Sequence, residues 1–254
     1  MIRFASENSR GHLLDAAFAR LALPDSLAPD VCLVLGGDGT MLRAIHAHGT
    51  AHSYLGINCG YLGFLMNDMA GDPDVVARNV AAALEAEGYV THGFPRLHMR
   101  AVTPDGDEIE SNAVNDVYVE RQSGQTVHLR VTVDGTEAVH RMVCDGLIAA
   151  TPLGSTAYSF SAGGAAAHPL VRATQLTAIC PHTPRLAPLV LPHSSRIRIE
   201  VLDAEHRPAR CVIDGQTVGN VERVDVHGAA VSVRLCFFDG HDFTRTLFAK
   251  LIRA

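Results

Sequence analysis

The first third of the chain alternates apolar runs with stretches of helical spacing, and this alternation restricts the possible fold more than any other feature. Val31–Leu35 is a continuous apolar run that ends at a glycine pair, as expected for a strand buried on both faces. Thr40–His48 has helical spacing and stops at Gly49, and Tyr54–Ile57 is the next strand candidate. This order of strand, helix and strand predicts a parallel sheet covered by helices.

Further elements on either side extend the same pattern. Ile2–Ala5 is a short strand candidate, and Gly11–Leu23 has the spacing of an amphipathic helix. Asp72 and Pro73 are a cap residue followed by proline at the first helical position, and we expect that helix to end at Gly88. The N-terminal part is therefore predicted to be a Rossmann-like α/β domain.

After about Phe94 the apolar residues recur with a period of two. The segments that alternate in this way include Leu97/Met99/Ala101, Val127/Leu129/Val131/Val133, Ile197/Ile199/Val201, Val224/Val226 and Val231/Val233/Leu235. Turn signals such as Asp134-Gly135 join them, so we predict a C-terminal antiparallel domain that resembles a β-sandwich.

The predicted domains are 1–94 and 95–240, with 241–254 packing back on the first. In that last segment Asp242 is placed to cap a short helix that carries a set of apolar residues on one side: Leu247, Phe248, Leu251 and Ile252. We expect this side to need a hydrophobic partner, which the first domain can supply.

Composition excludes several classes of protein. The 254 residues are 47% hydrophobic and 19% charged, an ordinary globular balance, and the net charge of −6 predicts no general attraction to nucleic acid or to anionic membranes. The six cysteines are scattered without a CxxC pair, which argues against a disulfide framework and a zinc ribbon. Because neither a signal peptide nor a membrane span is evident, we predict a soluble cytoplasmic protein.

The turn Gly36–Thr40 is the first candidate site. Its glycines let the backbone approach a ligand, and the helix N-terminus that follows favours phosphate. Asp38 would repel phosphate unless a divalent cation, or a hydroxyl whose proton it accepts, lies between them. The alternative is a tight strand-to-helix turn with an aspartate cap.

Two other segments also have a functional and an ordinary interpretation. Asn115-Asp116 either binds a ligand or simply ends a β-hairpin, because both residues favour turns. Thr151–Gly164 is dense in small and hydroxylated residues, which suits a ligand-lining loop but also a surface loop. Within it, Tyr158 either stacks on a base or fills core space.

Three remaining patterns are weaker. The histidines at 46, 48 and 52 include an i, i+4 pair but lack a third ligand with a recognisable spacing, so we expect a solvated helix end. Arg196 and Arg198 alternate along a strand and either meet a phosphate or carboxylate or face solvent. Ser155 does not have the sequence context of a hydrolase nucleophile.

Several segments together resemble the NAD kinase family. The GGDGT sequence at Gly36–Thr40 is similar to the signature that NAD kinases share with diacylglycerol and sphingolipid kinases. The other segments that match the family, in its order, are Gly56–Leu65, Asn112–Glu120, Asp145–Gly164 and Val190–Arg198 followed by Asp214–Gln216. The resemblance covers the chain from about Val31 to its end.

The resemblance implies a role for individual residues. Asp38 takes the place of the catalytic aspartate, and Asp145 that of the residue that receives the adenine amino group. The nucleotide-binding positions that it implies are Gly36, Gly37, Asp38, Gly39, Thr40, Asn115, Asp116, Asp145, Thr156, Ala157, Tyr158, Ser159, Ser161 and Gln216. It assigns no metal ligand.

The activity that the resemblance implies is phosphorylation of the adenosine-ribose 2′-hydroxyl of NAD to give NADP, with Asp38 as the general base. ATP, another nucleoside triphosphate or polyphosphate would supply the phosphate, together with Mg²⁺ or another divalent cation. The family also implies a homodimer or homotetramer. A lipid kinase and a catalytically silent NAD(P)-binding sensor are the alternatives, and the presence of Asp38 argues against the second.

Overall fold

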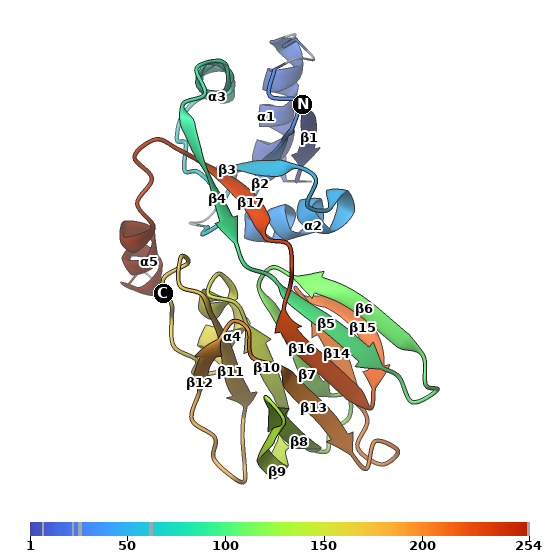
Figure 1. Cartoon of the computed structure of the whole chain (residues 1–254). Coiled ribbons are helices and arrows are strands. Elements are labelled where there is room, and N and C mark those ends of the chain that lie inside the picture. Colours follow the sequence, from blue (N-terminus) through green and yellow to red (C-terminus); the bar gives the residue numbers. More distant parts are fainter. Residues whose placement is uncertain (7, 22, 25–26, 61–62, 253–254) are drawn as a thin grey trace. The chain divides into compact units, whose positions relative to one another are not determined.

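The computed structural model describes residues 1–6, 8–21, 23–24, 27–60 and 63–252. The chain forms two compact units (Figure 1). Unit 1 comprises Met1–Phe94 and Ser232–Ala254, and unit 2 comprises Pro95–Val231. Each unit has its own sheets and its own apolar core.

Unit 1 is built on a five-stranded sheet with the order β1-β2-β3-β17-β4. The strands are β1 (Ile2–Ala5), β2 (Val31–Gly36), β3 (Ser53–Asn58), β4 (Tyr89–Phe94) and β17 (Val233–Phe238). Strands β1, β2, β3 and β17 pair in parallel, whereas β4 is antiparallel to β17. The predicted parallel sheet is confirmed.

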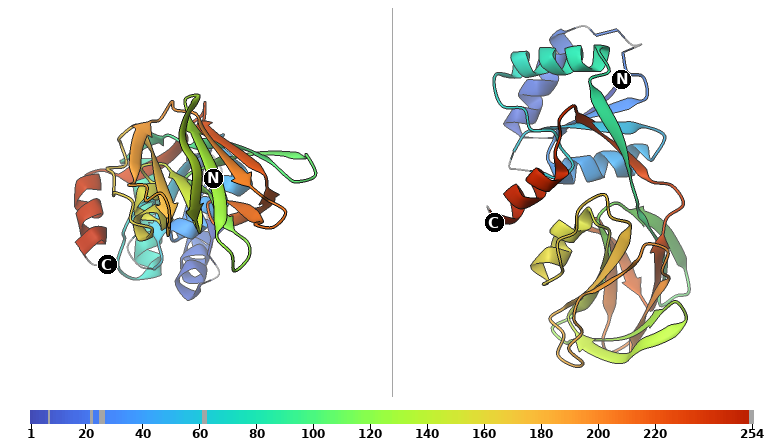
Figure 2. Two further views of the ribbon diagram at one scale, coloured as in Figure 1. Left: turned by 90° about the horizontal axis from the view of Figure 1, so that it is seen from below. Right: turned by 60° about the vertical axis from the view of Figure 1, so that its left-hand side comes forward.

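Helices cover both faces of this sheet, as the right-hand view of Figure 2 shows. The helices α1 (Ser9–Arg20) and α3 (Pro73–Glu85) share one core with β2 and β3, in which Leu55 and Ile57 of β3 are fully buried. The intervening Gly56 faces α2 (Asp38–His48), because a Cβ there would lie 2.7 Å from Cε of Met41. Alternate residues of β3 therefore face opposite helical layers.

The ends of these helices follow local sequence. Asp72 caps α3 by accepting hydrogen bonds from the backbone N–H groups of Asp74 and Val75, at 3.0 and 3.3 Å. Gly49 ends α2 with a φ of 70°. At the end of α3 the left-handed residue is Glu87, with a φ of 51°, and not the predicted Gly88.

The prediction that Val231/Val233/Leu235 belongs to the antiparallel domain is wrong for the strand that contains Val233 and Leu235, Val233–Phe238. This strand is β17, and it lies between β3 and β4 in the sheet of unit 1. In Figure 1 this orange-red strand runs beside strands from the other end of the sequence. Alternating apolar residues predict a strand but do not say which sheet it joins, because the pairing partner is set by distant residues.

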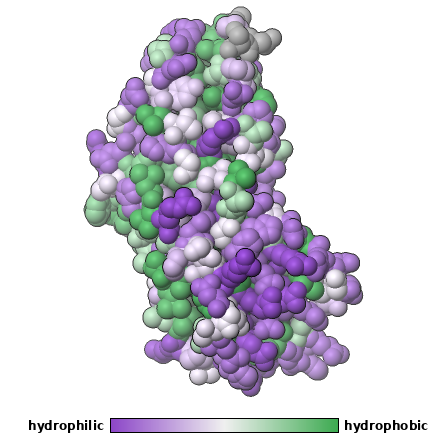
Figure 3. Space-filling model, viewed as in Figure 1, coloured by the Kyte–Doolittle hydropathy of each residue, from purple (hydrophilic) through white to green (hydrophobic). Residues whose placement is uncertain are grey.

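The last helix, α5 (Phe243–Ile252), belongs to unit 1. Asp242 accepts a hydrogen bond from the N–H of Arg245 at 3.0 Å, as expected of a cap. Phe243 is buried, but Phe248 and Ile252 are 56% and 78% exposed. On the predicted apolar side of this helix Phe248 and Ile252 are thus exposed, whereas Leu247 and Leu251 are partly buried, and apolar atoms lie over α5 in Figure 3.

Unit 2 contains two six-stranded antiparallel sheets. The β7 sheet has the order β12 (Leu189–Pro192), β11 (Ala173–Ile179), β10 (Gly146–Ala150), β7 (Asp116–Arg121), β14 (Ala209–Ile213) and β15 (Gln216–Val221). The β13 sheet has the order β6 (Glu108–Ala113), β5 (Leu97–Val102), β16 (Arg223–Gly228), β13 (Ile197–Leu202), β8 (Val127–Val133) and β9 (Thr136–Cys144).

The two sheets of unit 2 share a single core. Leu97 and Met99 of β5 and Val117 and Val119 of β7 are fully buried members of it. The predicted antiparallel sandwich is therefore confirmed. Polar residues alternate with these apolar ones, and Figure 3 shows a hydrophilic surface over β5, β6 and β16. None of the helices in the described residues is long and apolar enough to cross a membrane.

Candidate active site

The turn Gly36–Thr40 joins β2 to α2. The helix begins at Asp38, two residues before the predicted start at Thr40, so the carboxylate belongs to the first helical turn. Gly37 is the N-cap residue, and no side chain of the described residues caps this end. A Cβ on Gly36 would lie 2.4 Å from Oγ1 of Thr40, so this position requires glycine. The turn presents helix N–H groups that can bind phosphate oxygens.

The carboxylate of Asp38 is oriented by the backbone of a second motif. Its Oδ2 accepts a hydrogen bond from the N–H of Phe64 at 2.9 Å, and its Oδ1 accepts one from the N–H of Leu65 at 3.0 Å. A Cβ on Gly63 would lie 2.4 Å from Oδ1, so glycine leaves room for the carboxylate. The side chain of Asp38 is 26% exposed and therefore accessible to a ligand.

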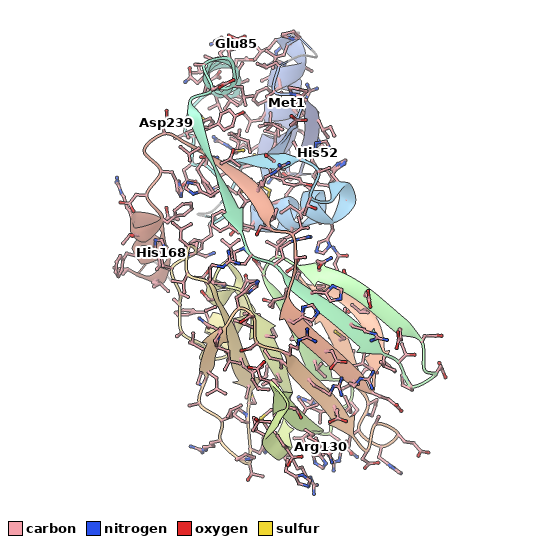
Figure 4. All side chains as sticks on the ribbon, in the orientation of Figure 1. Met1, His52, Glu85, Arg130, His168 and Asp239 are labelled. Atoms are coloured by element: carbon pink, nitrogen blue, oxygen red, sulfur yellow. The ribbon has the colours of Figure 1, made fainter. Side chains whose placement is uncertain are left out.

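The carboxyl ends of β2, β3 and β17 lie at one edge of the unit 1 sheet. The motif Gly56–Leu65 covers the end of β3 and the turn after it, although its residues 61 and 62 lie outside the described part. The loop after β17, on which Figure 4 marks Asp239, borders a polar pocket of about 400 Å³. Gly63 lines this pocket as well as contacting Asp38. Ligands of open α/β sheets bind at this edge.

In unit 2 the Asn115-Asp116 pair is held by a distant carboxylate. Oδ1 of Asp214 accepts hydrogen bonds from the N–H groups of Asn115 and Asp116 at 2.7 and 3.2 Å, and Oδ2 accepts one from Val114 at 2.8 Å. Asp214 and Gly215 form the two-residue turn between β14 and β15, with φ of 47° and 80°. The pair is thus fixed by a turn about a hundred residues further along.

Asp116 is a buried carboxyl group, with 4% of its surface exposed. Burial, and after it the nearby carboxylate of Asp214, raise the pKa of Asp116 from 3.8 to about 7. A fraction of Asp116 is therefore protonated near neutral pH, and the group can donate as well as accept a hydrogen bond.

The motif Asp145–Gly164 packs against the same backbone. Oγ1 of Thr151 donates a hydrogen bond to the carbonyl of Val114 at 2.6 Å, and the N–H of Thr151 donates to the carbonyl of Asn115 at 2.8 Å. A Cβ on Gly154 would lie 2.1 Å from the carbonyl oxygen of Asn115, so only glycine fits. Small residues in this motif therefore allow the backbone to pack closely, in addition to any role in binding a ligand.

The outer face of β7 carries a row of polar side chains. Val117 and Val119 face the core, so Asp116, Tyr118 and Glu120 point to the opposite side of the sheet. The ring of Tyr118 meets that of Tyr158 edge-on, with 5.1 Å between centroids. Tyr158 thus covers this face of the sheet and does not lie in the sandwich core.

A pocket of about 230 Å³ adjoins this tyrosine pair. It is lined by Glu120, Arg121, Asp145, Tyr158, Ile179 and Arg210. Oδ1 of Asp145 pairs with Nε of Arg121 at 2.8 Å, and Oε1 of Glu120 pairs with Nη2 of Arg210 at 2.6 Å. An aromatic ring beside hydrogen-bonding groups of both signs suits a flat polar group such as a nucleobase.

The remaining predicted site residues differ in accessibility. Thr156–Ser161 spans the end of η1 (Gly154–Thr156) and the single helical turn α4 (Tyr158–Ser161), and it is not an irregular loop. Oγ of Ser159 is buried and hydrogen bonded to Oγ1 of Thr177 at 2.9 Å, so it supports the turn from inside. Gln216 is exposed at the start of β15.

Of the other patterns noted in the sequence, Arg198 and Ser155 make contacts within unit 2. In the described residues no group of three or more metal-ligating side chains occurs, and the six cysteines are free thiols. Nε of Arg198 pairs with Asp225 at 2.6 Å. Oγ of Ser155 donates to the carbonyl of Pro152 at 2.7 Å and accepts from the N–H of Ala167 at 2.9 Å.

Sequence reasoning missed Tyr118, Glu120 and Arg210 and did not foresee how Asp214 acts. The alternation in Asp116–Arg121 was a usable signal, because two valines facing the core require the residues between them to face outward. The Asp214-Gly215 dipeptide was a signal for a hairpin turn. Nothing in the sequence said which backbone the Asp214 carboxylate would bind.

Comparison with known proteins gives concordant matches. A sequence profile of the ATP-NAD kinase C-terminal domain matches residues 114–236. An NAD kinase of Cereibacter sphaeroides is 35% identical over 240 residues, which cover 93% of this chain and 90% of the relative. Among solved structures, an NAD kinase from Archaeoglobus fulgidus in complex with ATP has a TM-score of 0.76 and 26% identity, covering all of this chain and 98% of that one. Yeast NADH kinase complexed with NADH has a TM-score of 0.78 and 29% identity, covering 87% of this chain and 65% of that one.

Proposed function

Because this chain belongs to the NAD kinase family, we propose that it transfers a phosphoryl group from ATP to the adenosine-ribose 2′-hydroxyl of NAD, forming NADP. The observation that carries the proposal is the carboxylate of Asp38, held by two backbone N–H groups at the start of α2. A carboxylate fixed in this way, in a turn suited to phosphate, can accept the proton of a hydroxyl that attacks a phosphoryl group.

In this proposal, unit 1 supplies the groups that bind the phosphate donor. The backbone of Gly36, Gly37, Asp38, Gly39 and Thr40 binds donor phosphates at the N-terminus of α2. The polar pocket beside Gly63 accommodates the rest of the phosphate chain. Asp38 orients the acceptor hydroxyl and takes its proton, and positioning accounts for most of the remaining rate enhancement.

Unit 2 supplies the groups for NAD. Asn115 and Asp116 bind the dinucleotide, and Asp214 holds the backbone that carries them. Asp145 accepts a hydrogen bond from the adenine amino group, and Tyr158 stacks beside the base. The further contacts that we propose come from Thr156, Ala157, Ser161 and Gln216, while Ser159 shapes the turn through Thr177.

A divalent cation completes the proposal. Nucleotide-bound Mg²⁺ needs only one or two protein carboxylates in addition to phosphate oxygens. Asp68, Asp239 and Asp242 line the pocket of unit 1 and can supply them, although the described residues contain no complete cage of protein ligands. When bound, the cation would neutralise charge on the donor phosphates.

We further propose, from family membership, that the enzyme is cytoplasmic and forms a homodimer or homotetramer. ATP is the donor that we expect, with polyphosphate or another nucleoside triphosphate as alternatives.

The first prediction tests the activity itself. Purified protein with NAD, ATP and Mg²⁺ is expected to form NADP, and EDTA is expected to stop the reaction because the donor phosphates lose their counter-charge. NADP is measured with glucose-6-phosphate dehydrogenase, which reports it specifically. Turnover in EDTA would remove the cation from the mechanism. Failure to form NADP with any phosphate donor, or phosphorylation of a lipid instead, would refute the proposed function.

The second prediction concerns Asp145. Asp145→Ala is expected to raise the KM for NAD about tenfold and to leave the KM for ATP within about twofold, because one hydrogen bond of the adenine amino group is lost. Asp225→Ala is the matched control, since it also removes a partly buried carboxylate from an arginine pair of unit 2. Equal changes in both KM values, or none, would place the adenine elsewhere.

A further inference from the structure

The chain contains a single lysine, and its position is unusual. Of the 21 Lys and Arg residues, 20 are arginines and only Lys250 is a lysine. Lys250 lies in the last turn of α5, and its Nζ is 3.5 Å from Oδ2 of Asp38. The one ammonium side chain is thus paired with the carboxylate to which the proposed function assigns the proton transfer.

The contacts of Lys250 fix it relative to Asp38. Its Nζ lies 4.4 Å from the ring centroid of Phe64, a cation–π geometry. The N–H of the same phenylalanine donates to Oδ2 of Asp38. Oδ2 therefore accepts an N–H and lies beside an ammonium group, whereas in the described residues Oδ1 accepts only the N–H of Leu65. Oδ1 keeps a lone pair for an acceptor hydroxyl.

This ion pair differs from the other ion pairs of unit 1 that lie in the described residues. Its partners are 30% and 26% exposed, whereas those of the Arg3–Asp15 pair are 34% and 43% exposed and those of the Arg20–Asp74 pair 59% and 48%. Partial burial reduces screening by water, so the Lys250 pair has more influence on its carboxylate than an ordinary surface pair.

We propose that Lys250 is a positioning residue for phosphoryl transfer, and that it holds Asp38 so that Oδ1 faces the acceptor hydroxyl. This inference rests on the proposed function of Asp38. It also explains why arginine is unsuitable here. A guanidinium binds both oxygens of a carboxylate in a fork and would occupy Oδ1, whereas an ammonium contacts one oxygen. The helix α5, in which Phe243 is the one buried side chain of the described residues, is thereby part of the active site.

Steady-state kinetics test the inference. Lys250→Met is expected to lower kcat about tenfold and to leave the KM values for NAD and ATP within about threefold, because misorientation of Asp38 slows the chemical step and not binding. Lys250→Arg is expected to restore less than half of the lost activity. Arg20→Met, which breaks the exposed pair with Asp74, is the matched control and should retain wild-type kcat.

A measurement without substrates gives a second readout. Because Lys250 carries the only ε-amine, reductive methylation with carbon-13 formaldehyde labels it alone beside the chain's α-amine. The NMR signal of dimethyl-Lys250, which keeps its charge, is expected to move in Asp38→Asn and to stay in place in Asp72→Asn. Suppose that Asp38→Asn is slow, as the proposed function requires. The inference about Lys250 would then be overturned by an unmoved NMR signal, by a wild-type kcat for Lys250→Met, or by full rescue in Lys250→Arg. If Asp38→Asn itself keeps full activity, both the inference and the assignment of Asp38 fail.

Discussion

Asp38→Asn is expected to lower kcat by about 10²–10⁴-fold, the range that loss of a general base typically produces. Asparagine has nearly the same shape as aspartate but cannot accept a proton. Because the lost interaction develops in the transition state, kcat and kcat/KM should fall together, and calorimetric titration should show that much of the NAD affinity remains.

The contacts of Asp38 indicate that Asp38→Asn also lowers the free energy of unfolding. The two oxygens of Asp38 accept N–H groups of Phe64 and Leu65, and the amide of asparagine can accept only one of them. We therefore expect Asp38→Asn to lose about 1–3 kcal/mol of unfolding free energy as well. Kinetics must be measured on protein shown to be folded at the assay temperature.

Asp72→Ala is the matched control for this effect. Oδ1 of Asp72 accepts two backbone N–H groups at a helix start in unit 1, where it caps α3, and alanine removes this acceptor whereas asparagine would keep it. A similar loss of stability in both variants, with slow turnover only in Asp38→Asn, would separate catalysis from folding. A kcat of Asp38→Asn within a few-fold of wild type would make Asp38 a structural residue. A collapse of NAD affinity would instead make it mainly a binding group.

Asp214→Ala is expected to have the second-largest effect. It removes the acceptor of three backbone hydrogen bonds, from Val114, Asn115 and Asp116. Hydrogen bonds to charged groups contribute about 1.5–3 kcal/mol each, and partial solvation of the freed N–H groups leaves a net loss of about 3 kcal/mol. For a unit of this size the melting temperature should fall by roughly 10 °C.

The same variant should weaken NAD binding more than its stability loss explains, because Asn115 and Asp116 lose their fixed backbone. We expect the KM for NAD to rise more than about tenfold. Asp134→Ala is the matched control, since Asp134 and Gly135 form a turn of the same kind, with φ of 49° and 80°. Within the described part of the chain the Asp134 carboxylate accepts only the N–H of Arg196. If both variants changed the KM for NAD alike, Asp214 would not organise the NAD site.

The sequence alone determined the local elements of this protein. The apolar run Val31–Leu35 and the glycine turn after it predicted a buried parallel strand leading into a helix, and that is β2, the turn and α2. The period-two segments after Phe94 predicted the sandwich of unit 2. These signals succeed because backbone preference and burial pattern are set within about ten neighbouring residues.

The family motifs also pointed to Asp38, Asn115, Asp116 and Asp145 as candidate site residues, but the sequence did not say what holds each of them. Asp38 is oriented by two backbone N–H groups and by Lys250, from the other end of the chain. Hydrogen bonds from three backbone N–H groups to Asp214 fix the Asn115-Asp116 pair.

Only the tertiary structure decided which distant segments meet. The strand β17 lies between β3 and β4 although its alternation equally fits the sandwich, and the carboxylate of Asp214 reaches back to Asn115. Neither the pairing of β17 nor the contact of Asp214 can be predicted from residues nearby in the sequence. Contacts between segments so far apart in the chain depend on the packing of the whole unit. The residues that orient the candidate site are therefore visible only once the chain has folded.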